Sequence, residues 1–267
     1  MSNIRPAAVA GAFYPGGRAE LERDVGAMLG AAPEAVGTPP KALIVPHAGY
    51  VYSGPTAACA YRWLEKQRGT VTRVVLLGPA HRVACRGLAV PGADGFATPL
   101  GVVPIDTAAL AAIRALPQVV VSREAHRLEH SLEVQLPFLQ QTLGEFKLVP
   151  FVVGAATAEE VAEVIDALWG GPETLILVSS DLSHFHAYRT AQEIDRGTVR
   201  RILALHEGIS HEQACGGTPI NGLLLVAARR GLQAELLDLC NSGDTAGDRD
   251  RVVGYCAIAF REIAHAD

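Results

Sequence analysis

The stretch TLILVSSDLSHFH, residues 174–186, joins an unbroken apolar run to a cluster of acidic and imidazole side chains. An apolar run without polar alternation is typical of a strand that is covered on both faces. The runs with this character are TLILVSS (174–180), ALIVP (42–46), RVVLLG (73–78) and KLVPFVV (147–153). We expect AELLDLC (234–240) and VVGYCAIAF (252–260) to form later strands.

Helical patterns alternate with these runs and cover residues 18–29, 54–67, 129–143, 157–170, 190–205 and 218–231. Thr157 and Glu160 have the spacing of a capping box. Thr218 is expected to cap the last helix, and Pro137 to kink the third. Strands alternating with helices predict an α/β fold, which we interpret as a single three-layer α/β/α domain over residues 1–267 with a largely parallel central sheet.

The composition excludes several classes of protein. The chain has 267 residues and a formal net charge of −5, and a mildly acidic chain without a basic cluster is poorly suited to nucleic-acid binding. No apolar run approaches the ~20 residues that span a bilayer, and the first residues lack the pattern of a signal peptide. Five widely spaced cysteines indicate reduced thiols. We therefore expect a cytoplasmic protein without nucleic-acid or membrane partners.

Chemically active side chains follow three of the predicted strands. Ligands of open α/β sheets bind outside the carboxyl ends of the strands. His47 follows the run at 42–46, His81 follows the run at 73–78, and Asp181 and His184 follow the run at 174–180. Each side chain, taken alone, is also compatible with a turn or a helix cap. Together they bring imidazoles, the commonest metal ligands, to one edge of the sheet.

Cys215 is the best candidate for a third ligand. It lies in ACGGTPI, two glycines before a helix start, where flexible glycines let the sulfur approach a site. A helix N-terminus and a bound metal both favour the thiolate. The alternative is a small buried apolar residue, which is our interpretation of the other four cysteines, Cys59, Cys85, Cys240 and Cys256.

The segment AHRLEHSLEVQLPFLQ, residues 125–140, is dense in His and Glu. His126 and His130 are four residues apart, as are Glu129 and Glu133, so each pair would share a helix face. The spacing is not that of a zinc-protease helix. It favours a solvated helix face over a binding site. We likewise expect His186, two residues beyond His184, to have a supporting or surface role.

Five segments carry a resemblance to a known family: VPHAGYVYSGPTAACAY (45–61), LLGPAHR (76–82), EHSLEVQLPFL (129–139), SSDLSHFH (179–186) and CGGTPINGLLL (215–225). They resemble the signature segments of the Memo family, whose bacterial and archaeal members are also called AmmeMemoRadiSam system protein B. The similarity runs in order from RPAAVAGAFYPG (5–16) to GYCAIAF (254–260), which is almost the whole chain.

The resemblance implies a fold like that of class III extradiol dioxygenases, in which two histidines and a glutamate hold non-haem iron(II). By motif, His47 and His81 fall at the histidine-ligand positions, and His184 resembles the acid/base histidine of the pocket. Cys215 stands where those enzymes have their carboxylate ligand. Family members are reported to bind iron or copper, so iron(II) is the leading cofactor. A thiolate in place of a carboxylate makes the site softer and favours copper(I) or zinc as alternatives.

Three functions follow from these expectations. The first is a metal-dependent oxidoreductase, in which His184 shuttles a proton and Asp181 orients it. The second is a module that binds a metal with a small-molecule or peptide ligand and does not turn over. The third, implied by the family name, is a partner of radical-SAM and AMMECR-type proteins in a modification system.

Overall fold

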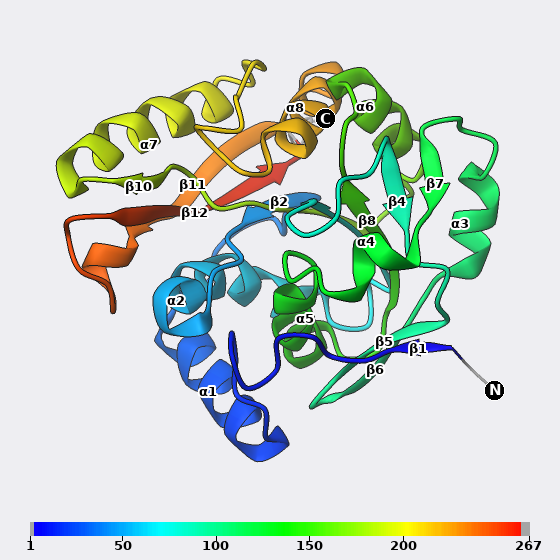
Figure 1. Ribbon diagram of the computed structural model, residues 1–267, viewed down its shortest axis with the longest axis horizontal. Coiled ribbons are helices and arrows are strands. Elements are labelled where there is room, and N and C mark those ends of the chain that lie inside the picture. The colour runs from blue at the N-terminus through cyan, green and yellow to red at the C-terminus, as the bar shows by residue number, and fades with distance from the viewer. Residues whose placement is uncertain (1–2, 263–267) are drawn as a thin grey trace.

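A nine-stranded mixed sheet forms the centre of the computed structural model, which describes residues 3–262 (Figure 1). Its strands are β2 (Ala42–Val45), β3 (Arg73–Pro79), β4 (Leu88–Val90), β7 (Val119–Val121), β8 (Lys147–Val153), β9 (Thr174–Ser179), β10 (His184–His186), β11 (Gln233–Asn241) and β12 (Val252–Arg261). The order is β10-β12-β2-β9-β3-β8-β4-β7, and β11 pairs with β12. The central strands β2, β9, β3 and β8 are parallel, whereas β12 and β4 join them antiparallel.

Each central strand sends alternate side chains to two separate cores. Leu175 and Leu177 of β9 pack into one core, while Ile176 and Val178 pack into the other. Both sets are apolar because helices cover both faces of the sheet. The predicted α/β fold with a parallel centre is confirmed. The predicted single domain over residues 1–267 includes residues 1–2 and 263–267, which lie outside the described residues.

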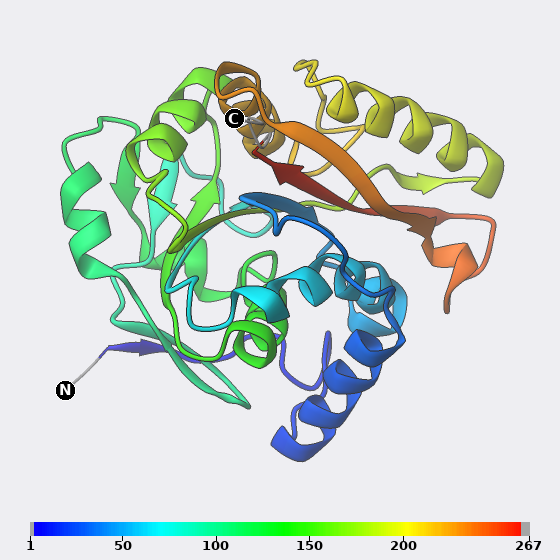
Figure 2. The ribbon, with the colours of Figure 1, turned by 180° about the vertical axis from the view of Figure 1, so that it is seen from behind.

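Helices lie on both faces of the sheet (Figures 1 and 2). The first core is covered by α1 (Arg18–Ala31), α2 (Tyr50–Tyr61) and α5 (Leu136–Leu143). The second core is covered by α3 (Thr107–Ile113), α6 (Ala158–Ala167), α7 (Tyr188–Leu203) and α8 (Gly217–Arg229). The remaining elements are α4 (Arg123–Arg127), the 3-10 turns η1 (Arg62–Gln67), η2 (Glu133–Gln135) and η3 (Ser242–Asp244), and a small sheet of β1 (Ile4–Arg5), β5 (Gly95–Thr98) and β6 (Gly101–Pro104).

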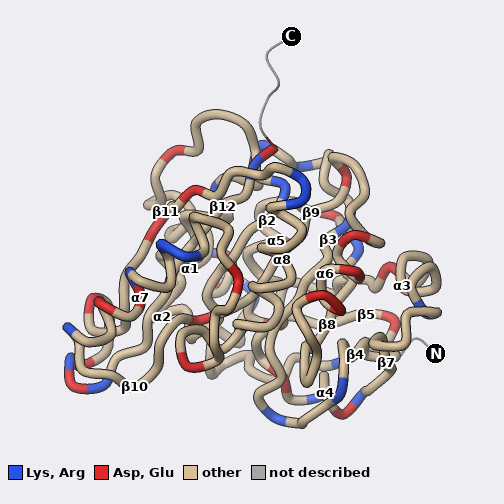
Figure 3. Tube along the Cα trace, turned by 90° about the horizontal axis from the view of Figure 1, so that it is seen from above, with Lys and Arg blue, Asp and Glu red and all other residues tan. Residues whose placement is uncertain are grey.

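Charged residues lie mainly around the outside of the fold, and the central strands are largely free of them (Figure 3). Within residues 3–262, no helix has the length and apolar character that crossing a membrane requires.

The predicted helix over residues 129–143 is wrong in its first half. Residues 128–132 are not helical, and α5 begins only at Leu136. The cause is the Glu129 carboxylate, which accepts the backbone N–H groups of His130 and Ser131 in competition with a helix. Pro137 therefore does not kink a long helix. It lies in the first turn of α5, where a missing N–H costs little.

The two predicted helix caps have different outcomes. The capping box of Thr157 and Glu160 at the start of α6 is confirmed. The cap predicted at Thr218 is wrong, because α8 begins at Gly217 with Gly216 before it. Gly216 donates its N–H to Ser180 Oγ at 2.9 Å, and an added Cβ would lie 2.7 Å from the Ser180 Cβ. This close approach to the end of β9 sets where the helix starts.

A buried ion pair fastens the N-terminal segment to the loop that precedes α5. Glu133 is fully buried and accepts hydrogen bonds from Arg5 Nη1 at 2.7 Å, the Val9 N–H at 2.9 Å and the Tyr14 hydroxyl at 2.7 Å. Arg5 also donates to the backbone carbonyl of Glu129 at 2.7 Å. The first strand and the 128–135 loop therefore form one bonded unit.

Arg5→Ala is expected to lower the free energy of unfolding by about 3–5 kcal/mol, because it leaves the Glu133 carboxylate buried without its partner. Urea denaturation followed by fluorescence measures the change. Arg18→Ala is the matched control, since Arg18 pairs with Glu22 at the surface, and it should cost less than about 1 kcal/mol. Equal losses in the two variants would show that the buried pair contributes no more than the exposed one.

Candidate metal centre

His47 and His81 meet at the carboxyl edge of the sheet. β9 lies between β2 and β3, and its residues pair in register with both strands, so the three strands end together. His47 follows β2 by two residues, and His81 follows β3 by two residues. Their ring centroids are 5.1 Å apart. The structure thus brings together the two histidines that the sequence places after separate strands.

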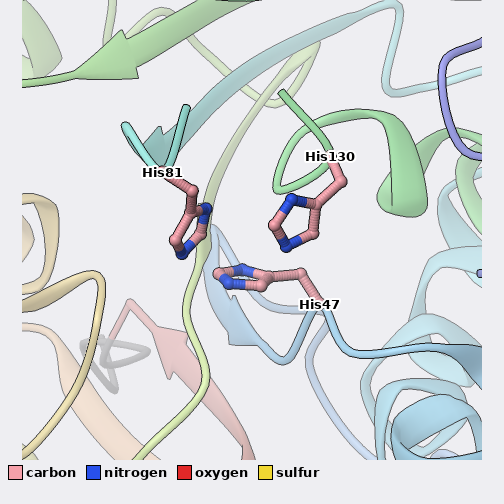
Figure 4. Close-up of side chains that lie close together, drawn as sticks. All are labelled: His47, His81 and His130. Carbon is pink, nitrogen blue, oxygen red and sulfur yellow. The ribbon is translucent and has the colours of Figure 1, made fainter. Parts of the chain in front are cut away.

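His130 completes a group of three imidazoles (Figure 4). Its ring centroid is 4.6 Å from that of His81 and 5.5 Å from that of His47. One nitrogen from each ring can be chosen so that all three lie within 4.8 Å of one another. Because metal–nitrogen bonds are about 2 Å long, donors of one ion are separated by up to about 4 Å. A movement of about 1 Å would therefore let these rings share an ion.

Glu129 fixes the orientation of His81. Its carboxylate accepts the His81 Nδ1–H at 2.9 Å and the His81 backbone N–H at 2.6 Å. Burial disfavours the charge, but the hydrogen bonds, first that from His81, bring the pKa of Glu129 down to about 2. Since an ionised carboxylate only accepts, Nδ1 of His81 carries a proton, and Nε2 is the ring atom at which a metal could bind.

Ser179 fixes the tautomer of His47 in the same way. The Ser179 hydroxyl donates its one proton to the Ser131 carbonyl at 2.6 Å, so it must accept from His47 Nδ1 at 2.8 Å. Burial, reinforced by the nearby His81 and His130 rings, lowers the pKa of His47 well below its usual value. His47 is therefore neutral at pH 7, with its lone pair on Nε2.

Cys215 lies beside that lone pair. Its Sγ is 3.3 Å from His47 Nε2, and its backbone N–H donates to the Asp181 carbonyl at 3.2 Å. The Asp181 carboxylate accepts the His47 backbone N–H at 2.7 Å. Burial raises the pKa of Asp181 to about 7 and that of the Cys215 thiol to about 12. In the described residues Asp181 thus contacts the His47 loop, and no hydrogen bond joins it to His184.

The expectation that residues 125–140 form a solvated helix face is wrong. Glu129 and Glu133 are almost wholly inaccessible to solvent, and so is His126. His126 points away from the three imidazoles, because its Nε2 lies 2.7 Å from the Ala89 carbonyl in β4. Sequence reasoning therefore missed His130 as a candidate ligand and Glu129 as the residue that holds His81.

Comparison with known proteins places this chain in a family. The profile of the family described as Memo-like protein matches residues 5–259. The chain belongs to the Memo family. It is 35% identical to a MEMO1 family protein of Aquifex aeolicus, over 96% of this chain and 99% of that one. It is 36% identical to a MEMO1 family protein of Methanopyrus kandleri, with the same coverage.

A crystal structure of an uncharacterized protein from Escherichia coli K12 aligns with this Memo-family chain with a TM-score of 0.49. The two sequences are 14% identical, and the alignment covers 81% of this chain and 98% of the other.

The strand that carries His184 in this Memo-family protein is anchored from α7. The Asp195 carboxylate accepts the Ser183 backbone N–H at 3.0 Å, directly before β10. Gly254 of β12 packs so tightly here that an added Cβ would lie 2.0 Å from Asp195 Oδ2. Phe185, next to His184, is 61% exposed and has a φ of 62°, which is unusual for an aromatic residue. The anchor therefore holds an irregular segment whose first side chain, His184, is half-buried.

Glu129→Gln is expected to lower metal affinity by about 10–100-fold, because the amide no longer fixes the His81 tautomer through two acceptor oxygens. Competition against a chelator of known affinity measures the change. Glu124→Gln alters an exposed carboxylate five residues earlier and should leave the affinity unchanged. Unaltered affinity in Glu129→Gln would mean that the Glu129 hydrogen bonds do not contribute to metal binding.

Asp195 gives stability a defined pH dependence. Burial raises its pKa to about 6, although hydrogen bonding to Ser183 and the nearby His186 charge oppose the shift. The folded protein therefore holds this proton more tightly than the unfolded chain does. The contribution of Asp195 to wild-type stability should therefore fall as pH rises from about 4 to about 6, by on the order of 3 kcal/mol.

Asp195→Asn removes this titration, so the variant should gain stability relative to wild type across that pH range and show a constant difference above it. Urea denaturation at stepped pH measures the difference. Asp24→Asn, at an exposed site, serves as the control. A difference between Asp195→Asn and wild type that stays constant from pH 4 to pH 7 would contradict the assignment.

Proposed function

We propose that this Memo-family chain binds a redox-active metal through His47, His81 and Cys215 and acts as a metal-dependent oxidoreductase. The observation that carries the proposal is the convergence of imidazoles whose Nδ1–H groups are already taken by Ser179 and Glu129. Their Nε2 atoms are thereby left available to donate an electron pair to a metal ion. Iron(II) is the first candidate and copper the alternative, whereas zinc, which has no redox chemistry, would suit only binding without turnover.

The donor set fits such a metal. Imidazole suits iron, copper and zinc, and a thiolate shifts the preference toward copper(I) and zinc. Cys215 Sγ lies next to His47 Nε2, and the group of three imidazoles lies beside it. His47 is buried, whereas His81 is exposed, so the site is open to solvent on the His81 side. A bound metal would supply Lewis-acid polarisation and one-electron redox chemistry.

The chain itself supplies a group for proton transfer. Burial lowers the pKa of His184, so its imidazole is neutral at pH 7 and able to take a proton from a bound substrate. Asp195 holds the segment before β10, which keeps His184 at the edge of the site. Asp181 holds the backbone of His47. We assign proton transfer to His184 and the positioning of the site to Asp181.

The test begins with metal analysis of protein purified without chelators or metal-affinity resin. His47→Ala and His81→Ala should each lose the metal while keeping the wild-type circular dichroism spectrum. Retention of full metal content in either variant would place the metal elsewhere.

For turnover, we expect oxygen uptake by protein reconstituted anaerobically with iron(II), assayed with a panel of catechols and small metabolites. His184→Ala should lower the rate by about 10²–10⁴-fold and keep the metal. His206→Ala, a change at an exposed histidine, is the control. Metal binding without uptake for any substrate of the panel would favour the second function, a metal- or peptide-binding module.

A further inference from the structure

We propose that this metal site has two interchangeable third ligands, the Cys215 thiolate and the His130 imidazole, and that the metal's own preference selects between them. The inference rests on the proposed metal site and adds to it the residue that decides which metals are accepted. His47 and His81 are the two ligands that both arrangements share.

Cys215 can approach the site because its loop is tied to the end of β9. The Cys215 and Gly216 N–H groups donate to the Asp181 carbonyl and to Ser180 Oγ. These bonds hold Cys215 Sγ at 3.3 Å from His47 Nε2. The sulfur therefore lies next to the His47 atom at which an ion would bind.

His130 approaches the same two histidines from a different element. It lies in the loop before α5, and its ring stacks on His81 at 4.6 Å (Figure 4). Its Nδ1 is buried without a hydrogen-bond partner in the described residues. The nearest acid is Glu129, whose Oε1 lies 3.4 Å from this Nδ1. A small rotation would let Glu129 accept the His130 Nδ1–H as it accepts that of His81, and His130 Nε2 would then be free to bind a metal.

The two ligands differ in chemistry. A metal that binds through Cys215 forms a metal–sulfur bond and releases the thiol proton to solvent. A metal that binds through His130 takes a nitrogen lone pair and releases no proton. Soft thiolate favours copper(I), whereas imidazole suits divalent ions such as nickel(II) and iron(II). A site with both donors beside one histidine pair can thus accept ions of both kinds.

The test measures the affinities of wild type, Cys215→Ala and His130→Ala for copper(I) under anaerobic conditions and for nickel(II), each by chelator competition. Cys215→Ala should weaken copper(I) binding by at least about tenfold and leave nickel(II) binding unchanged. Tenfold is the lower end of the loss in affinity when a residue that hydrogen-bonds to a metal ligand is removed. His130→Ala should weaken nickel(II) binding and leave copper(I) binding unchanged. The wild-type nickel(II) complex should lack a sulfur-to-metal charge-transfer band in the near ultraviolet.

Cys59→Ser and His206→Ala are matched controls at a partly exposed thiol and an exposed imidazole, and they should change neither affinity. Cys215→Ser and His130→Gln repeat the measurement if either alanine variant does not fold. Loss of both metals in the Cys215 variants, with neither lost in the His130 variants, would overturn the proposal and leave a single ligand set. Wild-type protein that binds neither metal would instead overturn the proposed metal site itself.

Discussion

The site depends on a carboxylate that is buried inside the protein. Burying the Glu129 carboxylate without hydrogen-bond partners would be strongly unfavourable, because it would leave an unpaired charge inside the protein. The carboxylate instead accepts hydrogen bonds from His81 and from the backbone of its own loop. Those bonds divert residues 128–132 from a helical path, and the diverted loop places His130 against His81. One electrostatic requirement therefore sets both the local backbone and the grouping of the imidazoles.

A second buried carboxylate, Glu133, holds the same loop from its other side. Its partners come from the N-terminal segment, more than a hundred residues away in sequence. Arg5 binds Glu133 and also the Glu129 carbonyl, so the two carboxylates belong to one network. The N-terminal segment is thus part of the structure that supports the site, although it contributes no candidate ligand.

The sequence predicts the parts of this structure that follow from local pattern. The central strands were predictable because both faces are covered, which leaves wholly apolar runs such as 175–178. β4, β7 and β10 have only three residues each, too few for any pattern, and their neighbours in the sheet define them. His47 and His81 were predictable because they follow strands directly. His130 was not, because its place depends on the contact between Glu129 and His81, which are 48 residues apart.

The hydrogen bonds around His47 and His81 fix the orientation of both rings. Ser179 and Glu129 fix ring tautomers in advance, so a metal meets lone pairs that need little reorganisation. Within residues 3–262, His130 Nδ1 is buried without a hydrogen-bond partner, a cost that an apolar side chain would avoid. A ligand that binds only the folded state would add its binding free energy to the stability of the fold. A metal bound as proposed would therefore offset part of the cost of placing these polar groups inside the protein.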